Sequence, residues 1–163
     1  AKGIPAWRAN LMPAMLILTG LLEGVGLLGI ASSLASWRFE VSMTFISYWG
    51  AGLALINALV WQRYIDYAKP QGIPLLARKE LHRITPMLRL MGHFAPLILF
   101  ALAAAVSYSM LAIAGAFAVS GGVLWKLTVI MRAGYQQGFA LPKMPQRGSG
   151  TRAAPARLDG LAR

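Results

Sequence analysis

The stretch Thr19-Gly20-Leu21-Leu22-Glu23-Gly24-Val25-Gly26-Leu27-Leu28-Gly29 places one carboxylic acid inside an otherwise apolar run. No other charged residue occurs between about Leu11 and Leu34. This length matches the roughly 20 residues that a helix needs to cross the hydrocarbon core of a bilayer. The stretch therefore predicts a transmembrane helix over about residues 11–35, with Glu23 in its interior.

The helical period places Gly20, Glu23 and Gly24 on one face of this helix. The two glycines have the small-xxx-small spacing that lets a second backbone come close, so we expect the acid to face protein. An ionised carboxylate near mid-bilayer is costly unless it is paired or protonated. Glu23 is therefore either a functional proton-exchanging group or a structural hydrogen-bonding group between helices.

The composition places the whole chain in a membrane. Of its 163 residues, 57% are hydrophobic and only 13% are charged, against about 25% charged residues in soluble domains. The absence of cysteine excludes disulfides, thiolate zinc sites and iron–sulfur clusters held by this chain, and no other metal site is predicted. The net charge of +11 does not indicate nucleic-acid binding, because the basic residues flank apolar runs instead of forming a groove.

Three further spans follow along the chain. A second apolar run covers about residues 41–62, with Asn57 as its one strongly polar residue and with Trp49 and Trp61 near its ends. The apolar sequence from Met91 to Leu124 is too long for one span, and a turn at Ser107-Tyr108-Ser109 divides it into spans of about 90–106 and 110–133. We therefore predict an all-α, integral membrane four-helix bundle over residues 1–135, followed by a basic tail at 136–163.

Basic residues mark one side of this bundle. Between the second and third spans lies a basic extramembrane connection, within which residues 74–84 have the pattern of a short helix on the membrane surface. The successive extramembrane segments carry two, one, six, none and seven Lys and Arg residues. The positive-inside rule then predicts that both termini and the long connection are cytoplasmic, in the inner membrane of a bacterium.

His93 opens the predicted third span, three residues before Pro96. A histidine at a membrane boundary suits a quinone carbonyl or a proton relay, or it bonds a backbone carbonyl or a lipid headgroup. Asn57 forms a hydrogen bond between helices or touches a ligand. Haem b is not expected, because its two axial histidines come from two helices and the second histidine here, His82, is predicted outside the bilayer.

Two classes of function fit these features. In the first, the bundle docks a redox protein on its basic side and handles a quinone and its protons near the same surface. In the alternative, the chain is a small four-helix proton-coupled transporter in which Glu23 binds protons and a cationic substrate in turn. The long basic connection and tail favour docking, because small exporters of this kind have little sequence outside the membrane.

The run Arg132-Ala133-Gly134-Tyr135-Gln136-Gln137-Gly138-Phe139-Ala140-Leu141-Pro142, with Pro145 and Arg147-Gly148 after it, resembles the C-terminal signature of a family of membrane anchors. These are the anchor subunits of the dimethyl sulfoxide reductase and polysulfide reductase type, near those of phenylacetyl-CoA:acceptor oxidoreductases. The resemblance implies a subunit without substrate chemistry of its own. It would hold a molybdopterin catalytic subunit, containing molybdenum or tungsten, on the membrane through an iron–sulfur subunit. Electrons would be exchanged with menaquinone or ubiquinone. Family members often have eight or more helices, so this chain resembles a C-terminal half.

The resemblance also divides the candidate residues by role. The quinone and proton candidates are Glu23, His93 and Asn57. The candidates for shaping the last helix end against the iron–sulfur subunit are Arg132, Tyr135, Gln136 and Gln137. The candidates for pairing with acidic partner residues or with phospholipid are Arg83, Arg89 and Lys126.

Overall fold

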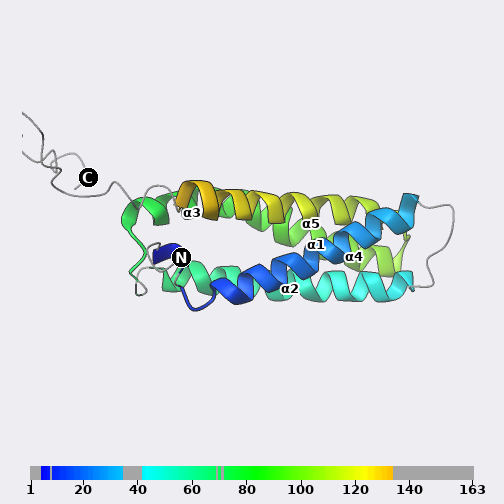
Figure 1. Cartoon of the computed structure of the whole chain (residues 1–163). Helices are drawn as coiled ribbons and strands as arrows, with labels where there is room; N and C mark the ends of the chain where they lie inside the picture. Colours follow the sequence, from blue (N-terminus) through cyan, green and yellow to red (C-terminus); the bar gives the residue numbers. More distant parts are fainter. Residues whose placement is uncertain (1–4, 8, 35–41, 69, 71, 134–163) are drawn as a thin grey trace, which may run out of the picture.

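The computed structural model describes residues 5–7, 9–34, 42–68, 70 and 72–133, and these form an up-and-down bundle of four long helices (Figure 1). All four helices are long and apolar enough to cross a membrane. No strand occurs among the described residues. The prediction of an all-α, integral membrane four-helix bundle is thus confirmed.

A short 3₁₀ turn, η1 (Pro5–Trp7), precedes the first long helix, α1 (Met12–Leu34). Pro13 lies in the first turn of α1, where a missing backbone N–H costs no hydrogen bond. The second helix, α2 (Met43–Tyr67), ends before a turn in which Gly72 has a φ of +73°, a conformation that glycine adopts without strain. Pro74 then directly precedes the third helix.

The third long helix consists of α3 (Leu75–Met87), a wide π-helical turn η2 (Leu88–Phe94) and α4 (Ala95–Ala105) without a break. The separate surface helix expected at residues 74–84 is therefore wrong, because that segment is the beginning of a 31-residue helix. Pro96 has no backbone N–H and cannot donate the hydrogen bond of a regular α-helix. The N–H of Ala95 donates to the carbonyl oxygen of Leu90, five residues earlier, which is the hydrogen bond of a π-helix. Such a wide turn adds a residue and keeps one side of the helix facing the core.

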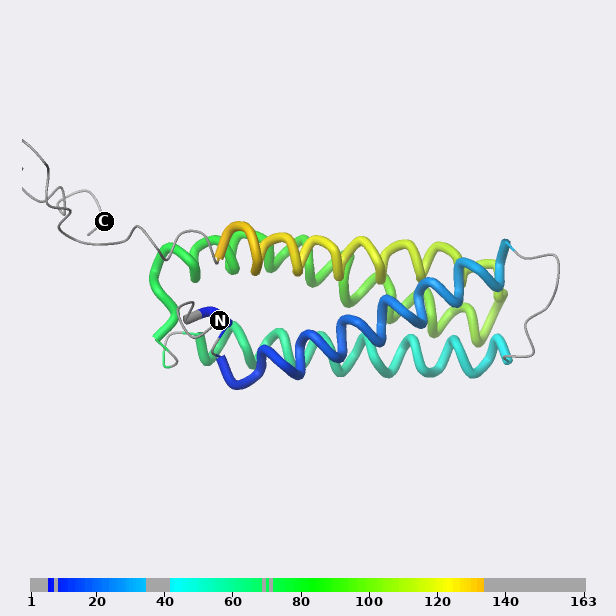
Figure 2. The backbone as a smooth tube through the Cα atoms, in the orientation of Figure 1, coloured from blue at the N-terminus to red at the C-terminus, as the bar shows by residue number. Residues whose placement is uncertain are grey.

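The last helix, α5 (Met110–Leu127), continues into a second π-helical turn, η3 (Thr128–Ala133). It begins directly after residues 107–109, so the predicted tight turn is confirmed. Around the bundle, α1 packs between α2 and α5, and α4 packs against both α2 and α5. Figure 2 shows that α1 runs obliquely across the other helices, from a position beside α2 to one beside α5.

The oblique path of α1 gives the bundle two different halves. Where α1 meets α5, a Cβ on Gly115 would lie 2.2 Å from the carbonyl oxygen of Gly26, so the two backbones touch. Towards the other end, long side chains fill the wider space between the two helices, among them Trp125 and Lys126. We call this wider half the charged-end half, because η1, η3 and the α2–α3 connection lie at its end (Figure 1).

Candidate functional site

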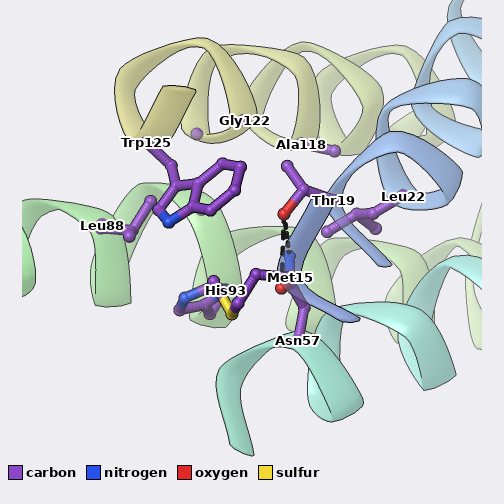
Figure 3. A pocket seen from close by; sticks show the side chains of 11 residues that line it. Met15, Thr19, Leu22, Asn57, Leu88, His93, Ala118, Gly122 and Trp125 are labelled. Atoms are coloured by element: carbon purple, nitrogen blue, oxygen red, sulfur yellow. Dashed lines mark hydrogen bonds between the residues drawn. The ribbon is translucent and has the colours of Figure 1, made fainter. Parts of the chain in front are cut away.

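A small enclosed cavity lies where α1, α2, η2 and α5 come together in the charged-end half (Figure 3). Its volume is about 10 Å³, close to the least space that holds one water molecule. Polar groups from three helices border it, namely Thr19 on α1, Asn57 on α2 and His93 on η2. The other lining residues are Met15, Leu22, Leu88, Gly92, Ala118, Gly121, Gly122 and Trp125.

His93 is inside the bundle and not at its boundary, which corrects the sequence prediction of its position. Only 2% of the residue is exposed, and both ring nitrogens are buried without a hydrogen-bond partner. The prediction placed the start of the third span near residue 90, whereas the helix begins at Leu75 and carries His93 several turns inward. The π-helical turn lets both Gly92 and His93 face the core. A buried imidazole without a partner is unusual, since buried polar groups are normally bonded.

Asn57 connects α2 to α1, as expected of an interhelical hydrogen bond. Its Nδ2 lies 3.4 Å from Thr19 Oγ1, and its Oδ1 lies 3.5 Å from the same hydroxyl. These distances are at the long end for hydrogen bonds, so each contact is weak. The amide therefore keeps donor and acceptor capacity for a group in the cavity.

Trp125 is a cavity residue that the sequence reasoning missed. Its indole is 2% exposed, and its Nε1–H has no partner. Figure 3 shows the indole on the opposite side of the cavity from the Thr19–Asn57 pair. A tryptophan near a helix end is usually assigned to the membrane interface, so the sequence did not indicate that Trp125 lines a cavity. Trp61, near the end of the second predicted span, is 1% exposed and belongs to the core.

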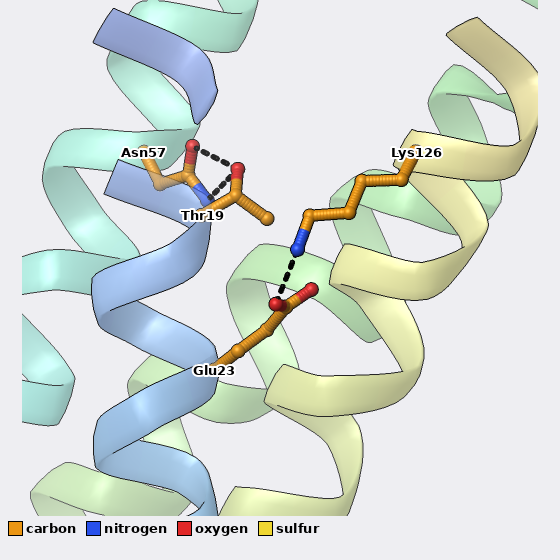
Figure 4. Close-up of polar contacts among 4 residues, drawn as sticks. All are labelled: Thr19, Glu23, Asn57 and Lys126. Atoms are coloured by element: carbon orange, nitrogen blue, oxygen red, sulfur yellow. Dashed lines mark hydrogen bonds and ion pairs between the residues drawn. The ribbon is translucent and has the colours of Figure 1, made fainter. Parts of the chain in front are cut away.

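Glu23 forms an ion pair with Lys126 of α5 across 2.5 Å, between Oε2 and Nζ (Figure 4). Lys126 therefore contacts a carboxylate of its own chain, although it was expected to meet a partner or a lipid. The Glu23 side chain is 16% exposed and that of Lys126 is 35% exposed. The remaining carboxylate oxygen, Oε1, is buried and has no hydrogen-bond partner. The pair explains how an ionised carboxylate is tolerated at this depth.

Gly122 makes the space for this carboxylate. A Cβ at Gly122 would lie 1.9 Å from Glu23 Oε1, so even alanine does not fit without a shift. Gly122 also lines the cavity, and Thr19 lies one helical turn before Glu23. The ion pair and the His93 cavity are thus neighbours with a common wall at Gly122. Gly20 and Gly24 were expected to let a second helix of the chain come close. No atom lies within 4 Å of a Cβ added at either glycine, so this prediction is wrong within the chain.

The depths of the Glu23–Lys126 ion pair and of the His93 cavity in the bundle follow from the helix lengths. Glu23 lies eleven residues from each end of α1, about 16 Å at 1.5 Å per residue. Lys126 is closer to the charged end, but helical side chains lean towards the N-terminus of their helix, which for α5 is the deeper side. Lys126 therefore reaches inward to Glu23. Trp125 lies eight residues from Ala133, which puts the cavity about 12 Å beneath the charged end.

The cations expected to meet a partner form local contacts at the charged end. Arg83 pairs with Glu80 across 3.7 Å, and its side chain is 62% exposed. Arg89 donates to the amide oxygen of Gln62, whose Nε2 bonds Asp66 at 2.8 Å. Arg132, on the last described turn, is exposed. Tyr135, Gln136 and Gln137 lie outside the described residues.

The site combines a buried imidazole, an indole donor, an amide and a neighbouring ion pair in a largely apolar setting. Among the described residues, no group of three His, Cys, Asp or Glu side chains is placed to hold a metal ion. The available chemistry is therefore hydrogen bonding to a carbonyl or hydroxyl oxygen, together with proton transfer.

No family model matches the chain, and neither a curated protein nor a solved structure was found to be similar to it.

Proposed function

We propose that this chain is the membrane-anchor subunit of a molybdenum or tungsten oxidoreductase. In this proposal it docks an iron–sulfur subunit at its charged end and exchanges electrons with the quinone pool. The observation that carries the proposal is the His93 cavity, which lies about two turns beneath the charged end and is bordered by unpartnered hydrogen-bonding groups. The resemblance of the 132–148 segment to anchor subunits supports the same assignment.

A quinone fits the chemistry of these groups. Its two carbonyl oxygens accept hydrogen bonds, and its reduction takes up two protons with two electrons. His93 donates or accepts a proton, and the Trp125 indole donates a hydrogen bond. The cavity volume of about 10 Å³ is far smaller than a quinone ring. A ring must therefore displace side chains when it enters, and the flexible Met15 lines the cavity.

The electrostatics of the charged end fit docking from the cytoplasmic side. The exposed cations Arg63, Lys79, Arg83, Arg89 and Arg132 all lie on segments at this end. An acidic partner surface would be attracted to them, and salt would weaken this attraction. By the positive-inside rule the same end is cytoplasmic, which places the iron–sulfur subunit in the cytoplasm of a bacterium.

The alternative function, a small proton-coupled transporter, would use Glu23 as its carrier carboxylate. Such a carboxylate must be open to a cationic substrate in one state and to a proton in another. In this chain Glu23 is already neutralised by Lys126, and Gly122 encloses its second oxygen. A substrate cation would have to compete with the tethered Lys126 for the ionised carboxylate, so the ion pair favours the anchor over the transporter.

Purification in mild detergent from the native membrane tests the proposal. At low salt we expect the chain to copurify with a subunit that contains iron and acid-labile sulfide, and with a larger subunit that contains molybdopterin. A wash at high salt should release both together, because the contact is electrostatic. Isolation of the chain without iron, in a form that transports cations against a proton gradient, would contradict the anchor and support the transporter.

A pair of histidine variants tests the quinone site in the intact complex. We expect His93→Gln to lower quinol-linked turnover at least about 10-fold, since positioned acid–base groups typically contribute 10²–10⁴-fold. His82→Gln is the matched control, because His82 is exposed on the same helix outside the cavity. Equal turnover in both variants would remove His93 from the reaction.

A further inference from the structure

Glu23 and His93 come from different helices, and both carry buried polar atoms without a hydrogen-bond partner. Glu23 Oε1 lies against Gly122, and Gly122 lines the cavity that His93 also borders. Thr19 forms a second connection, because it lines the cavity and lies one turn from Glu23 on α1. The cavity has room for about one water molecule. One water molecule hydrogen-bonded to both groups would be enough to pass a proton between them.

We propose that Glu23 and His93 form one proton-exchange unit across this wall, in which Glu23 receives the proton that His93 releases. This deepens the proposed function, because the protons would be those of the quinone. In the forward step an N–H bond of the His93 imidazolium breaks and its proton passes to the water. The water gives up another of its protons, and an O–H bond forms on Glu23 Oε1. The products are a neutral imidazole and a neutral carboxylic acid, and no oxidant or reductant is involved.

The charges around the unit favour this exchange. The groups that face Glu23 are Lys126 from α5 and the cavity wall, while α2 contributes only the uncharged Asn57. On η2 the charged neighbour of His93 is Arg89, one turn away and bonded to Gln62, and its positive charge repels a proton on His93. The negative charge of Glu23 attracts the same proton, so both charges favour transfer from His93 to Glu23.

Lys126 completes the cycle. When Glu23 takes up the proton, the ammonium group loses its counter-charge. The Lys126 side chain is 35% exposed and its helix emerges at the charged end, so the ammonium can turn towards the aqueous boundary. There the ammonium gives one proton to bulk water, and the neutral amine returns and takes the proton from Glu23, which restores the ion pair. The unit thus gives the enclosed cavity a route for protons to the charged end.

Infrared difference spectroscopy over a pH titration tests the unit on the full chain in lipid nanodiscs, without quinone or partner. The carboxyl signal that disappears in Glu23→Gln is assigned to Glu23. We expect this signal to change in the same pH interval as the imidazole signals of His93, and this coupled change to be lost in His93→Asn. His82→Gln is the control, and it should keep the coupled change of the wild type.

An unchanged Glu23 signal in His93→Asn, with native circular dichroism, would overturn the proposal. If His93→Asn does not fold, His93→Gln decides, because it keeps a polar side chain at this position but removes the imidazole that carries the proton. A Glu23 signal in His93→Gln identical to that of the wild type also overturns it. The titration requires no quinone, so a coupled change in a chain without quinol turnover would contradict the proposed function alone.

Discussion

The two halves of the bundle are stabilised in different ways. In the half away from the charged end, backbones touch at Gly26 and Gly115 and at Gly29 and Leu111, and the core around Phe100 is made of small and branched residues. In the charged-end half, large aromatic residues such as Trp61 and Trp125 fill the wider space between helices. The first half derives its stability from close backbone contact, and the second from bulky side chains.

The same division separates satisfied from unsatisfied polar groups. The described buried side-chain nitrogen and oxygen atoms without partners belong to Glu23, Trp61, Arg78, His93 and Trp125. Except for Glu23, at the junction, these residues lie in the charged-end half. Unpartnered polar atoms cost free energy, so they persist where function requires them or where a ligand satisfies them. The unpartnered polar groups, and with them the capacity for chemistry, are therefore concentrated in the charged-end half.

The largest loss of stability is expected from Gly115→Ala, which adds a methyl group in the tightly packed half. Its Cβ would lie 2.2 Å from the Gly26 carbonyl oxygen, so α1 and α5 must move apart. We expect the free energy of unfolding to fall by about 3 kcal/mol, at the upper end for overpacking. Unfolding in mixed detergent measures it. Gly24→Ala is the control, because nothing lies within 4 Å of its added Cβ; equal losses in both variants would refute the role of close packing.

Lys126→Met, at the junction of the two halves, should cause the next largest loss of stability. The change leaves the Glu23 carboxylate with no counter-charge inside the bundle. Breaking a buried pair costs about 3–5 kcal/mol; because Lys126 is 35% exposed, we expect a loss of about 2 kcal/mol. Adding Glu23→Gln to Lys126→Met should restore most of the loss in the same unfolding assay. A double variant less stable than Lys126→Met would contradict the pairing.

The sequence predicted the fold well because bilayer thickness imposes a length on each apolar run. Three of the four helices begin and end within a few residues of their expected bounds. The third did not, since basic residues at its beginning gave the pattern of a surface helix. Asn57 was also correctly expected to connect helices, because an amide among apolar residues has few other partners.

The site was harder to predict, because it depends on which helix faces meet. Glu23 and Lys126 are 103 residues apart, and no local pattern indicates that they pair. The position of His93 depends on a π-helical turn, which changes the side chains that face the core and has no simple sequence signal. A signal for Gly122 existed, since two adjacent glycines within a helix often mark close packing, but it did not reveal the carboxylate that the glycine accommodates.

Asn57→Leu should have a smaller effect, confined to the charged-end half. Hydrogen bonds between membrane helices contribute about 0.6 kcal/mol on average, and both Asn57–Thr19 contacts are long. We therefore expect a loss of about that size. Hydrogen exchange should become faster in α1 near Thr19 and stay unchanged near Gly26. Faster exchange over all of α1 would show that the two halves unfold together, which would weaken the division drawn above.

Arg83→Ala should have the smallest effect on stability, although it changes the surface proposed to meet a partner. The Arg83–Glu80 pair is 3.7 Å long and the arginine is 62% exposed, so we expect a change below about 0.5 kcal/mol. Partner retention should respond more strongly, because an exposed charge acts across an interface through long-range attraction. The salt concentration that releases half of the iron–sulfur subunit should fall in Arg83→Ala. Lys79→Ala, on the same helix, removes another exposed cation of the charged end and so measures the effect of total charge. An equal fall in both variants would mean that the charged end attracts its partner through total charge, without a specific contribution from Arg83.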